Sequence, residues 1–549
     1  MKENHEFVFS IVMAVYNAAP YLGEAFESLR RQSIGFDAVQ VILVDDGSTD
    51  GSGKICDTLA EKHPGNVSVL HRENGGQSAA RNAGMALAEG RYLNFMDSDD
   101  RLLPQTLERV AAFLAGHEAE TDVVAVPMRY FEADEGEHWQ NYLFEQGSRV
   151  IDLRKDFAFL QASASNAFFV RERVRDIRFR EGMSYAEDTR YAMTCLSLRQ
   201  TIGLEKDGCY EYRRRAAGDS STQKKAAHPL WKTDWMDGYE LWAMDFFLKK
   251  EGHIPRWVQY ALLCHLGNRV QEDAKTGNTG REAWYTEKIR KVAECIEPEV
   301  FAAAGEVRDG IRLMLKGLTA PGEEARLRRK NGAWELEVGG ETVCKISSMP
   351  VQLDRVQVLE NRARLEGFAF LYPGMEKQGL RLVLAEKGQE REIPLERRES
   401  RDIVWNGIPL CNAFEYCAET VPDSCGQAEV SFSFRLAQEE AISGRIEAGD
   451  QVPVLPYPYS TGWSGGWKYI VSATAVHLFP CASPLARVKR EMSWCLTLIR
   501  RRQYGALRKR ALYHLMKPWG GTPRWARQAR SLKMSQLDLE TKYNADLLF

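Results

Sequence analysis

The first hundred residues alternate between short apolar runs and longer stretches with a helical pattern. Residues 7–15 are apolar apart from one serine, residues 21–32 are amphipathic, and residues 39–44 form a second apolar run. Strands that are apolar on both faces must be covered on both faces, as parallel strands joined by helices are. The sequence therefore predicts an α/β unit built on a Rossmann-like, mixed but mostly parallel sheet.

The same alternation continues beyond the second apolar run. Further strands are predicted at residues 66–70 and 92–96, with an alanine-rich helix over residues 77–89 that Gly90 would end. Since the pattern fades near Thr222, we assign residues 1–225 to this first domain.

The remaining chain divides by its pattern into three parts. Residues 226–320 are predicted to be helical, residues 321–480 show the period-two alternation of a β-sandwich-like module, and residues 481–549 form a basic amphipathic helical tail. In the helical part, Trp231, Trp235, Tyr239, Trp242 and Phe246 recur at helical spacing. Packing is the simpler explanation of this aromatic stripe, and a surface for a sugar acceptor is the alternative.

Charge and cysteine content exclude several classes of protein. The net charge of −3 gives no reason to expect binding to nucleic acid. The eleven cysteines are scattered and never spaced Cys-x-x-Cys, so neither a disulfide framework nor a zinc site is indicated. We find no signal peptide and no apolar run of about 20 residues. We therefore expect a cytoplasmic protein.

Acidic residues follow two of the predicted strands. Residues 45–50 read Asp-Asp-Gly-Ser-Thr-Asp, and residues 97–100 read Asp-Ser-Asp-Asp. Because ligands of open α/β sheets bind at the carboxyl ends of the strands, both loops are expected at the binding edge. The first loop alone is also an ordinary turn. The second carries three carboxylates in four residues, which suits Mn²⁺ or Mg²⁺ bridging a diphosphate, although a solvated turn is the alternative.

A glycine-containing loop lies between these two acidic loops. It comprises Gly75 and Gly76 before a helix of small residues, with Arg81 one turn inside that helix. Such a loop allows close approach of a ligand to the backbone. The spacing is that of neither a dinucleotide-binding fingerprint nor a Gly-Lys-Ser phosphate loop.

Four segments taken together resemble, in order and spacing, the family 2 glycosyltransferases of GT-A fold. These segments are residues 10–17 (SIVMAVYN), 44–50 (VDDGSTD), 74–84 (NGGQSAARNAG) and 96–100 (MDSDD). The resemblance covers roughly residues 7–222. One departure is Ala14, where the family usually has proline, a change of backbone stiffness more than of chemistry.

The resemblance implies a set of site residues. Tyr16 would stack on the nucleotide base, Asp46 and Asn74 would bond to it, and Arg81 would border base and ribose. Asp97 would lie against the ribose and donor sugar, and Asp99 would bind the metal. The donor-binding residues are thus expected to be Ala14, Tyr16, Asp46, Asn74, Arg81, Asp97, Ser98, Arg215 and Ser221.

The family also implies a catalytic carboxylate in a Glu-Asp pair, which we assign to Asp188 of Glu187-Asp188. A single base that takes the proton of an acceptor hydroxyl suits an inverting transfer, since no covalent enzyme nucleophile is needed. Taken alone, this pair is an ordinary helix start. Arg215 and Ser221 belong to a segment similar to the family's mobile loop over the diphosphate, for which a solvated basic turn is the alternative.

The domain order resembles bacterial enzymes that glycosylate polyol-phosphate or polysaccharide chains, as in wall teichoic acid decoration. We therefore expect a nucleotide-sugar donor, a UDP-sugar, and a glycan or polyol-phosphate polymer as acceptor. The β module could bind that polymer or mediate homo-oligomerisation. A polyol-phosphate transferase and a non-catalytic polymer-binding protein are the alternatives.

The tail between residues 485 and 530 has thirteen Lys and Arg and one acidic residue, mixed with apolar side chains. A basic amphipathic segment of this kind is typical of proteins that lie on an anionic membrane. We expect peripheral binding to the inner face of the cell membrane, with packing on the acidic remainder of the chain as the alternative.

Overall fold

The computed structural model describes the chain as two compact units. The first comprises Met1–Leu262 and Cys295–Val300, and the second Leu263–Glu294 and Phe301–Phe549. The residues described are 7–133, 135–159, 163–215, 233–276, 283–359, 362–386, 388–406, 408–421, 428–436, 441–448, 460–464, 467–471 and 476–480.

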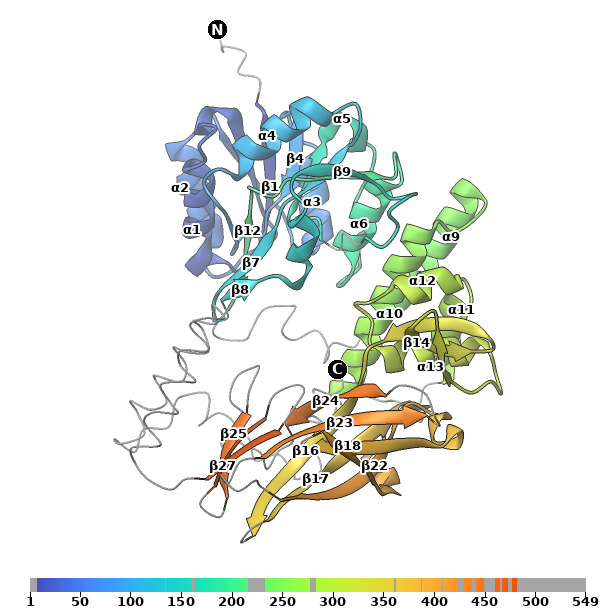
Figure 1. The fold of residues 1–549 in the computed structure, drawn as a ribbon. Coiled ribbons are helices and arrows are strands. Elements are labelled where there is room, and N and C mark those ends of the chain that lie inside the picture. Colours follow the sequence, from blue (N-terminus) through green and yellow to red (C-terminus); the bar gives the residue numbers. More distant parts are fainter. Residues whose placement is uncertain are drawn as a thin grey trace. The chain divides into compact units, whose positions relative to one another are not determined.

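Strands and helices alternate through the first unit (Figure 1). Its strands are β1 (Phe9–Val15), β2 (Val39–Asp45), β3 (Val67–His71), β4 (Tyr92–Phe95), β5 (Arg101–Leu102), β6 (Val123–Ala125), β7 (Met128–Glu132), β8 (Gly136–Glu137), β9 (Arg149–Asp152), β10 (Ala167–Val170), β11 (Thr201–Leu204) and β12 (Tyr210–Arg214). The helices are α1 (Ala19–Arg30), α2 (Ser52–Lys62), α3 (Gln77–Met85), α4 (Thr106–His117), α5 (Arg171–Val174), α6 (Glu187–Leu196), the π-helix η4 (Asp234–Glu240) and α9 (Leu241–Glu251), with short 3-10 turns η1 (Phe36–Ala38) and η2 (Trp139–Phe144).

The main sheet has the strand order β3-β2-β1-β4-β10-β6-β11-β9. Strands β1 to β4 pair in parallel, as do β6 and β11, whereas β10 and β9 run antiparallel to their neighbours. The prediction of a mixed, mostly parallel α/β sheet is thus confirmed.

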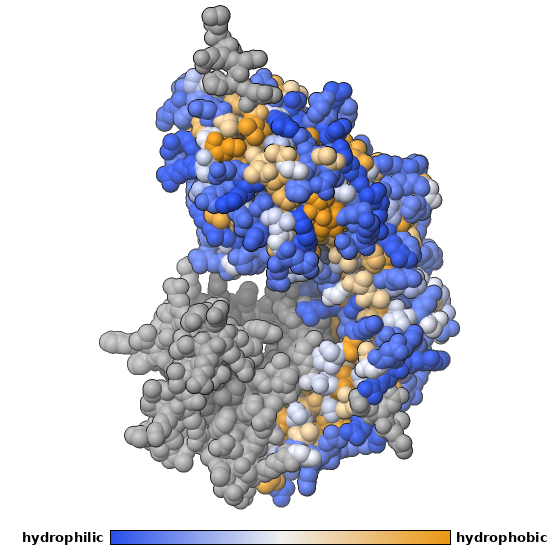
Figure 2. All heavy atoms as spheres, turned by 45° about the horizontal axis from the view of Figure 1, so that its top comes forward, coloured by the Kyte–Doolittle hydropathy of each residue, from blue (hydrophilic) through white to orange (hydrophobic). Residues whose placement is uncertain are grey.

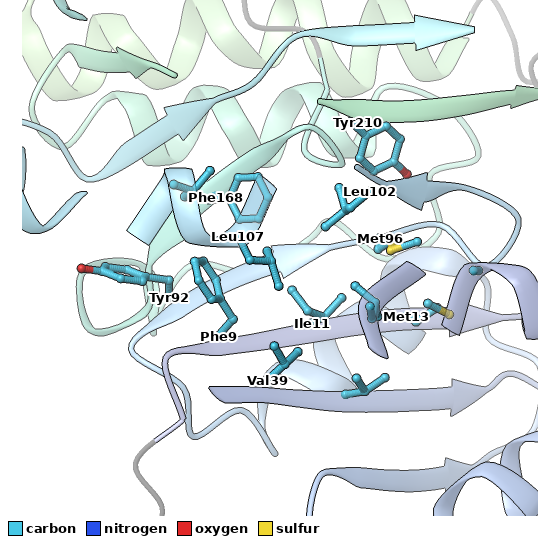
Figure 3. Packing of buried hydrophobic residues seen from close by; sticks show 14 of the residues in the cluster. Phe9, Ile11, Met13, Val39, Tyr92, Met96, Leu102, Leu107, Phe168 and Tyr210 are labelled. Carbon is cyan, nitrogen blue, oxygen red and sulfur yellow. The ribbon is translucent and has the colours of Figure 1, made fainter. Parts of the chain in front are cut away.

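The two faces of β1 pack against different helices. Phe9, Ile11 and Met13 point to one face, where apolar residues of α1 and α4 cover them (Figure 3). Val12 points to the other face, where α3 crosses it so closely that a Cβ on Gly84 would lie 2.5 Å from a Val12 methyl. A strand covered on both sides needs a continuous apolar run, which is what residues 7–15 supply.

Helix α3 ends earlier than predicted. Its last residue is Met85, so Gly90 is not its terminating residue. Gly90 instead lies against β1, where a Cβ would come within 2.4 Å of the Phe9 carbonyl carbon. The glycine is required by close packing of two backbones, which the sequence pattern alone does not distinguish from a helix end.

A second small sheet joins distant parts of the first unit. Its order is β5-β12-β7-β8, with β12 antiparallel to β5 and parallel to β7. Because β5 directly follows the acidic loop of residues 97–100, its pairing with β12 holds that loop against residues more than a hundred positions later.

The aromatic stripe is not a regular α-helical face. Its first part lies in η4, whose π-helical turns change the angular spacing of the side chains. Tyr239 is buried, whereas Trp242 and Phe246 are half-buried and stack on each other at 5.1 Å between ring centroids. Trp231 lies outside the described residues. Packing thus accounts for the buried Tyr239, whereas Trp235 lines a pocket of the first unit.

The remaining helices are α10 (Arg256–Thr276), α11 (Ala283–Ala293), α12 (Pro298–Ala303) and α13 (Asp309–Thr319). Strands of the second unit are β13 (Arg326–Lys330), β14 (Ala333–Val338), β15 (Glu341–Ile346), β16 (Ser348–Leu359), β17 (Arg362–Leu371), β18 (Leu380–Glu386), β19 (Gln389–Ile393), β20 (Leu395–Arg397), β21 (Ile403–Trp405), β22 (Ile408–Thr420), β23 (Ala428–Leu436), β24 (Ile442–Ala448), β25 (Ser460–Ser464), β26 (Trp467–Val471) and β27 (Val476–Pro480), with 3-10 turns η5 (Met375–Gln378) and η6 (Glu399–Arg401).

The strands of the second unit form two sheets in the part of the chain that is described (Figure 1). The smaller has the order β13-β14-β15, and the larger is built around the antiparallel strands β16, β17 and β22. The sheet-rich character predicted for residues 321–480 is confirmed there, while the sandwich arrangement stays a prediction.

The predicted tail, residues 481–549, lies outside the described residues. Its contact with a membrane therefore stays a prediction. No helix in the described ranges is long and apolar enough to cross a membrane. On the face drawn in Figure 2, hydrophilic residues predominate on the coloured surface and hydrophobic residues lie in separate small patches.

Candidate active site

A pocket of about 990 Å³ lies in the first unit, where β1, β2 and β4 end. Every predicted site residue that the structure describes lines it. These residues are Ala14, Tyr16, Asp46, Asn74, Arg81, Asp97, Ser98, Asp99, Asp188 and Arg215. Ser221 lies outside the described residues. The acidic loops thus share one edge of the sheet, as parallel strands require.

Asp46 organises the glycine-containing loop. Its carboxylate accepts hydrogen bonds from the backbone N–H groups of Gly75 at 3.0 Å and Gly76 at 2.8 Å, and Arg72 lies 3.1 Å away. Tyr16, by contrast, is 54% exposed at the rim. A fixed polar loop beside an exposed ring suits the binding of a flat heterocycle.

Arg81 is the buried cation of the site. It donates to Asp97 at 2.9 Å and to Glu187 at 3.2 Å, and Gln77 also donates to Asp97 at 2.9 Å. A guanidinium holds two carboxylates in defined positions because its donors form a rigid planar fork. Arg81 therefore connects the loop after β4 with the start of α6, two segments far apart in sequence.

The three aspartates after β4 have different environments. Asp100 is 1% exposed and accepts from the Tyr210 hydroxyl at 2.6 Å and the Arg213 backbone N–H at 2.7 Å. Burial, together with Asp99 and Asp97, raises the pKa of Asp100 well above its usual value. It does not line the pocket, so this carboxylate fastens the acidic loop to β12.

Asp99 faces the pocket and pairs with Arg215, whose guanidinium lies 2.7 Å from its carboxylate. Burial and the neighbouring Asp97 raise the pKa of Asp99, while Arg215 opposes the shift. Among the described residues, no group of three or more His, Cys, Asp or Glu side chains is placed to hold a metal ion. Asp99, with Asp97 nearby, therefore offers an oxygen-ligand pair and no complete cage.

Glu187 and Asp188 begin α6 after a strained residue. Ala186 has a φ of 63°, in the left-handed region that only glycine enters without cost. Burial and then Asp188 raise the pKa of Glu187 to about 8, although Arg81 opposes the shift. Burial also raises the pKa of Asp188, whose carboxylate accepts from the Thr189 backbone N–H at 2.7 Å. Backbone strain beside two perturbed carboxylates makes this corner a candidate functional site.

Stability should depend on pH through Glu187. Its pKa in the folded chain, about 8, lies above the ordinary 4.5, so the folded state binds an extra proton between about pH 5 and 8. The resulting stabilisation is complete below the unfolded pKa and is lost as the pH rises through 8, at about 1.4 kcal/mol per pH unit where steepest. Urea unfolding at pH 5.5, 6.5 and 7.5 should show this slope in the wild type and a flatter one in Glu187→Gln. Equal slopes would contradict the assignment.

Sequence reasoning missed one wall of the pocket. This wall is lined by Tyr130 of β7, His138 of the loop between β8 and η2, Arg214 of β12, and Trp235. The sequence pattern places Trp235 only in the aromatic stripe and does not single out Arg214. Alternating side chains on β7 and β12 would have indicated a common face, but nothing in the sequence indicates that these strands pair.

Comparisons with known proteins find the same family that the sequence motifs resemble. The family model described as Glycosyl transferase family 2 matches residues 10–178. The minor teichoic acid biosynthesis protein GgaB of Bacillus subtilis is 30% identical over 373 residues, which cover 67% of this chain and 41% of GgaB. This chain thus matches less than half the length of that relative.

A second relative is matched over most of its length. Glycosyltransferase GlyG of Streptococcus pneumoniae is 31% identical over 230 residues, which cover 39% of this chain and 74% of GlyG.

A third similar protein is the poly(ribitol-phosphate) beta-N-acetylglucosaminyltransferase TarS of Staphylococcus aureus, 28% identical over 212 residues covering 38% of this chain and 36% of TarS. The crystal structure of TarS 1-349 in complex with UDP-GlcNAc is 20% identical, covers 61% of this chain and 97% of that one, and has a TM-score of 0.46. On the family model and the extensive match to GlyG, the chain belongs to glycosyl transferase family 2.

Proposed function

We propose that the chain is an inverting, metal-dependent glycosyltransferase that moves a hexosyl or N-acetylhexosaminyl group from a UDP-sugar to a hydroxyl of a cell-envelope polymer, such as a teichoic acid or a capsular polysaccharide. The observation that carries this proposal is that Asp188 lines the same pocket as Tyr16, Asp46 and Asp99. One pocket thus holds a candidate base, a nucleotide-binding edge and a carboxylate for a cation.

Asp188 is the proposed general base. It takes the proton from the acceptor hydroxyl while that oxygen attacks the anomeric carbon, and the bond to the diphosphate breaks on the opposite side. Burial, which raises the pKa of Asp188, makes the carboxylate a stronger proton acceptor than an exposed aspartate. With one base and no enzyme nucleophile, the configuration at the anomeric carbon inverts.

The residues around Asp99 fit a divalent cation. Mn²⁺ and Mg²⁺ prefer oxygen ligands, and such ions are commonly held by one or two carboxylates plus substrate phosphates and water. Asp99 and Asp97 are the two carboxylates of the acidic loop that line the pocket, whereas Asp100 is committed to Tyr210 and Arg213. When bound, the ion supplies charge neutralisation for the departing nucleoside diphosphate.

The donor is proposed to lie along the β1–β2–β4 edge. Tyr16 stacks on the base, Asp46 and Asn74 bond to its polar edge, and Arg81 orients Asp97 toward the ribose and sugar. Support for this pose comes from the buried Arg81–Asp97 pair, which fixes the carboxylate in place before the donor arrives.

The acceptor class rests on the relatives. GgaB is named for minor teichoic acid biosynthesis, and TarS for transfer to poly(ribitol-phosphate). We propose a polyol-phosphate or related polymer as acceptor here, and the inner face of the cell membrane as the place of reaction.

Binding of UDP should test the donor and metal parts of this proposal together. By calorimetry, UDP is expected to bind the wild type at least about tenfold more tightly with Mn²⁺ than with EDTA, and Asp99→Asn should lose most of that gain. Asp176→Asn removes one charge at an exposed position and should keep the gain. The absence of any metal-dependent binding of UDP would contradict the proposal.

A further inference from the structure

The three consecutive arginines at the end of β12, residues 213–215, have different surroundings. Arg213 pairs with Glu24 and with Glu132, the latter at 2.6 Å, and Arg215 pairs with Asp99. The guanidinium groups of Arg213 and Arg215 both lie over the ring of Tyr21, at 5.0 and 4.8 Å from its centroid. These two arginines thus share one face, the face of the acidic loop.

Arg214 points to the other face, as alternation along a strand requires. Its guanidinium lies over the rings of Tyr130, at 4.5 Å, and Tyr212, at 5.6 Å, and it lines the pocket. Within the described part of the chain, no carboxylate pairs with it, and its buried Nε has no hydrogen-bond partner. A partly buried guanidinium with no carboxylate partner is costly unless an anion reaches its remaining N–H groups.

Arg214 is the positively charged group of this wall, because its neighbour His138 is neutral. His138 packs against Tyr130 at 5.6 Å between ring centroids and also lines the pocket. Burial, aided by the charge of Arg214, lowers the pKa of His138 to about 4, so the imidazole is neutral at physiological pH. The wall therefore presents one fixed charge among aromatic rings, which matches a single negative charge better than a doubly charged diphosphate.

We propose that Arg214, whose guanidinium lies over the rings of Tyr130 and Tyr212, binds a phosphodiester of the acceptor polymer. This inference rests on the proposed function, because it names the acceptor part of the same pocket. The phosphates of the donor are expected beside Asp99 and Arg215, which line the same pocket, so each anion has an arginine of its own. Two parallel N–H donors of the guanidinium match two phosphate oxygens.

Such a contact would set the register of the polymer. A polyol-phosphate chain carries one phosphodiester per repeat, so anchoring one phosphate places a hydroxyl of a neighbouring repeat at a fixed distance along the chain. The rings of Tyr130 and Tyr212 limit where the guanidinium can move, which lowers the entropy lost when the phosphate binds. Arg214 is thus a positioning residue for the acceptor and takes no part in proton transfer.

The test uses the full chain and a synthetic trimer of glycerol phosphate joined by phosphodiesters, with the neutral methyl triester of the same length for comparison. Calorimetry should show that wild type prefers the charged trimer, that Arg214→Met weakens its binding about tenfold or more, and that Arg214→Lys is intermediate, since lysine provides charge without the planar fork. Affinity for UDP with Mn²⁺ should change less than about twofold in both variants. Lys206→Gln, which removes an exposed charge outside the pocket, is the matched control.

Three results would overturn the inference: wild type that does not prefer the charged trimer, Arg214→Met that binds it as tightly as wild type, or a loss of UDP affinity equal to the loss for the trimer. The last would assign Arg214 to the donor phosphates. Equal thermal midpoints for wild type and Arg214→Lys show that the fold is intact. Failure of the proposed function appears separately, as absence of sugar transfer or UDP release by the wild type.

Discussion

Replacing Asp188 by Asn is expected to lower kcat for sugar transfer by about 10² to 10⁴ while KM for the donor changes little. The amide keeps the size and much of the hydrogen bonding of the carboxylate but cannot accept the proton of the acceptor hydroxyl. Initial rates of UDP release in the presence of acceptor, measured over a range of donor concentrations, separate the two constants.

The control for this substitution is Asp176→Asn, which makes the same chemical change at an exposed position of the first unit. Its kcat should equal that of the wild type. If Asp188→Asn retained more than about a tenth of the wild-type kcat, another group would have to be the base. Glu187 would then be the first to examine, because it is adjacent in the chain and lines the same pocket.

Replacing Arg81 by Ala is expected to lower the free energy of unfolding of the first unit by about 3–5 kcal/mol. Arg81 is buried and bonds to both Asp97 and Glu187, so its removal leaves a buried and a partly buried carboxylate without their cation. Protonation of Glu187, whose pKa is already raised to about 8, relieves part of this cost at low pH. Urea unfolding at pH 8.5 should therefore show a larger loss than unfolding at pH 6.

Arg30 provides a matched comparison, since it also makes two hydrogen bonds to carboxylate oxygens, both of Glu27, but on the exposed side of α1. Arg30→Ala should lower the free energy of unfolding far less than Arg81→Ala does, because water solvates the charges that remain. Similar losses in the two variants would show that burial does not govern the strength of the Arg81 contacts.

The sheet and its binding edge were predictable because strong local signals agree. The continuous apolar runs before Asp45 and Asp97 predict buried parallel strands, and topology then brings the loops after them to one edge. Membership of glycosyl transferase family 2 was predicted from the same segments and is confirmed.

What the sequence could not show depends on contacts between distant segments. Asp97, Asp99 and Asp100 look alike in the sequence, yet Asp100 alone is buried against Tyr210, more than a hundred residues later. The contact of Arg214 with the ring of Tyr130 likewise exists only because β7 and β12 pair. A period of 3.6 residues was assumed for the aromatic stripe, whereas η4 is a π-helix, in which Trp235 and Tyr239 still lie 5.6 Å apart between ring centroids.

The most direct test of the account is transfer itself. The full chain is incubated with Mn²⁺, a polyol-phosphate trimer and each of a panel of nucleotide sugars, and the products are examined by mass spectrometry and proton NMR. The account predicts that one UDP-sugar adds a single hexose or N-acetylhexosamine to the trimer, with anomeric configuration opposite to that of the donor. A product with retained configuration would contradict the single-base mechanism at Asp188, and no product from any donor would contradict the proposed activity on this acceptor class.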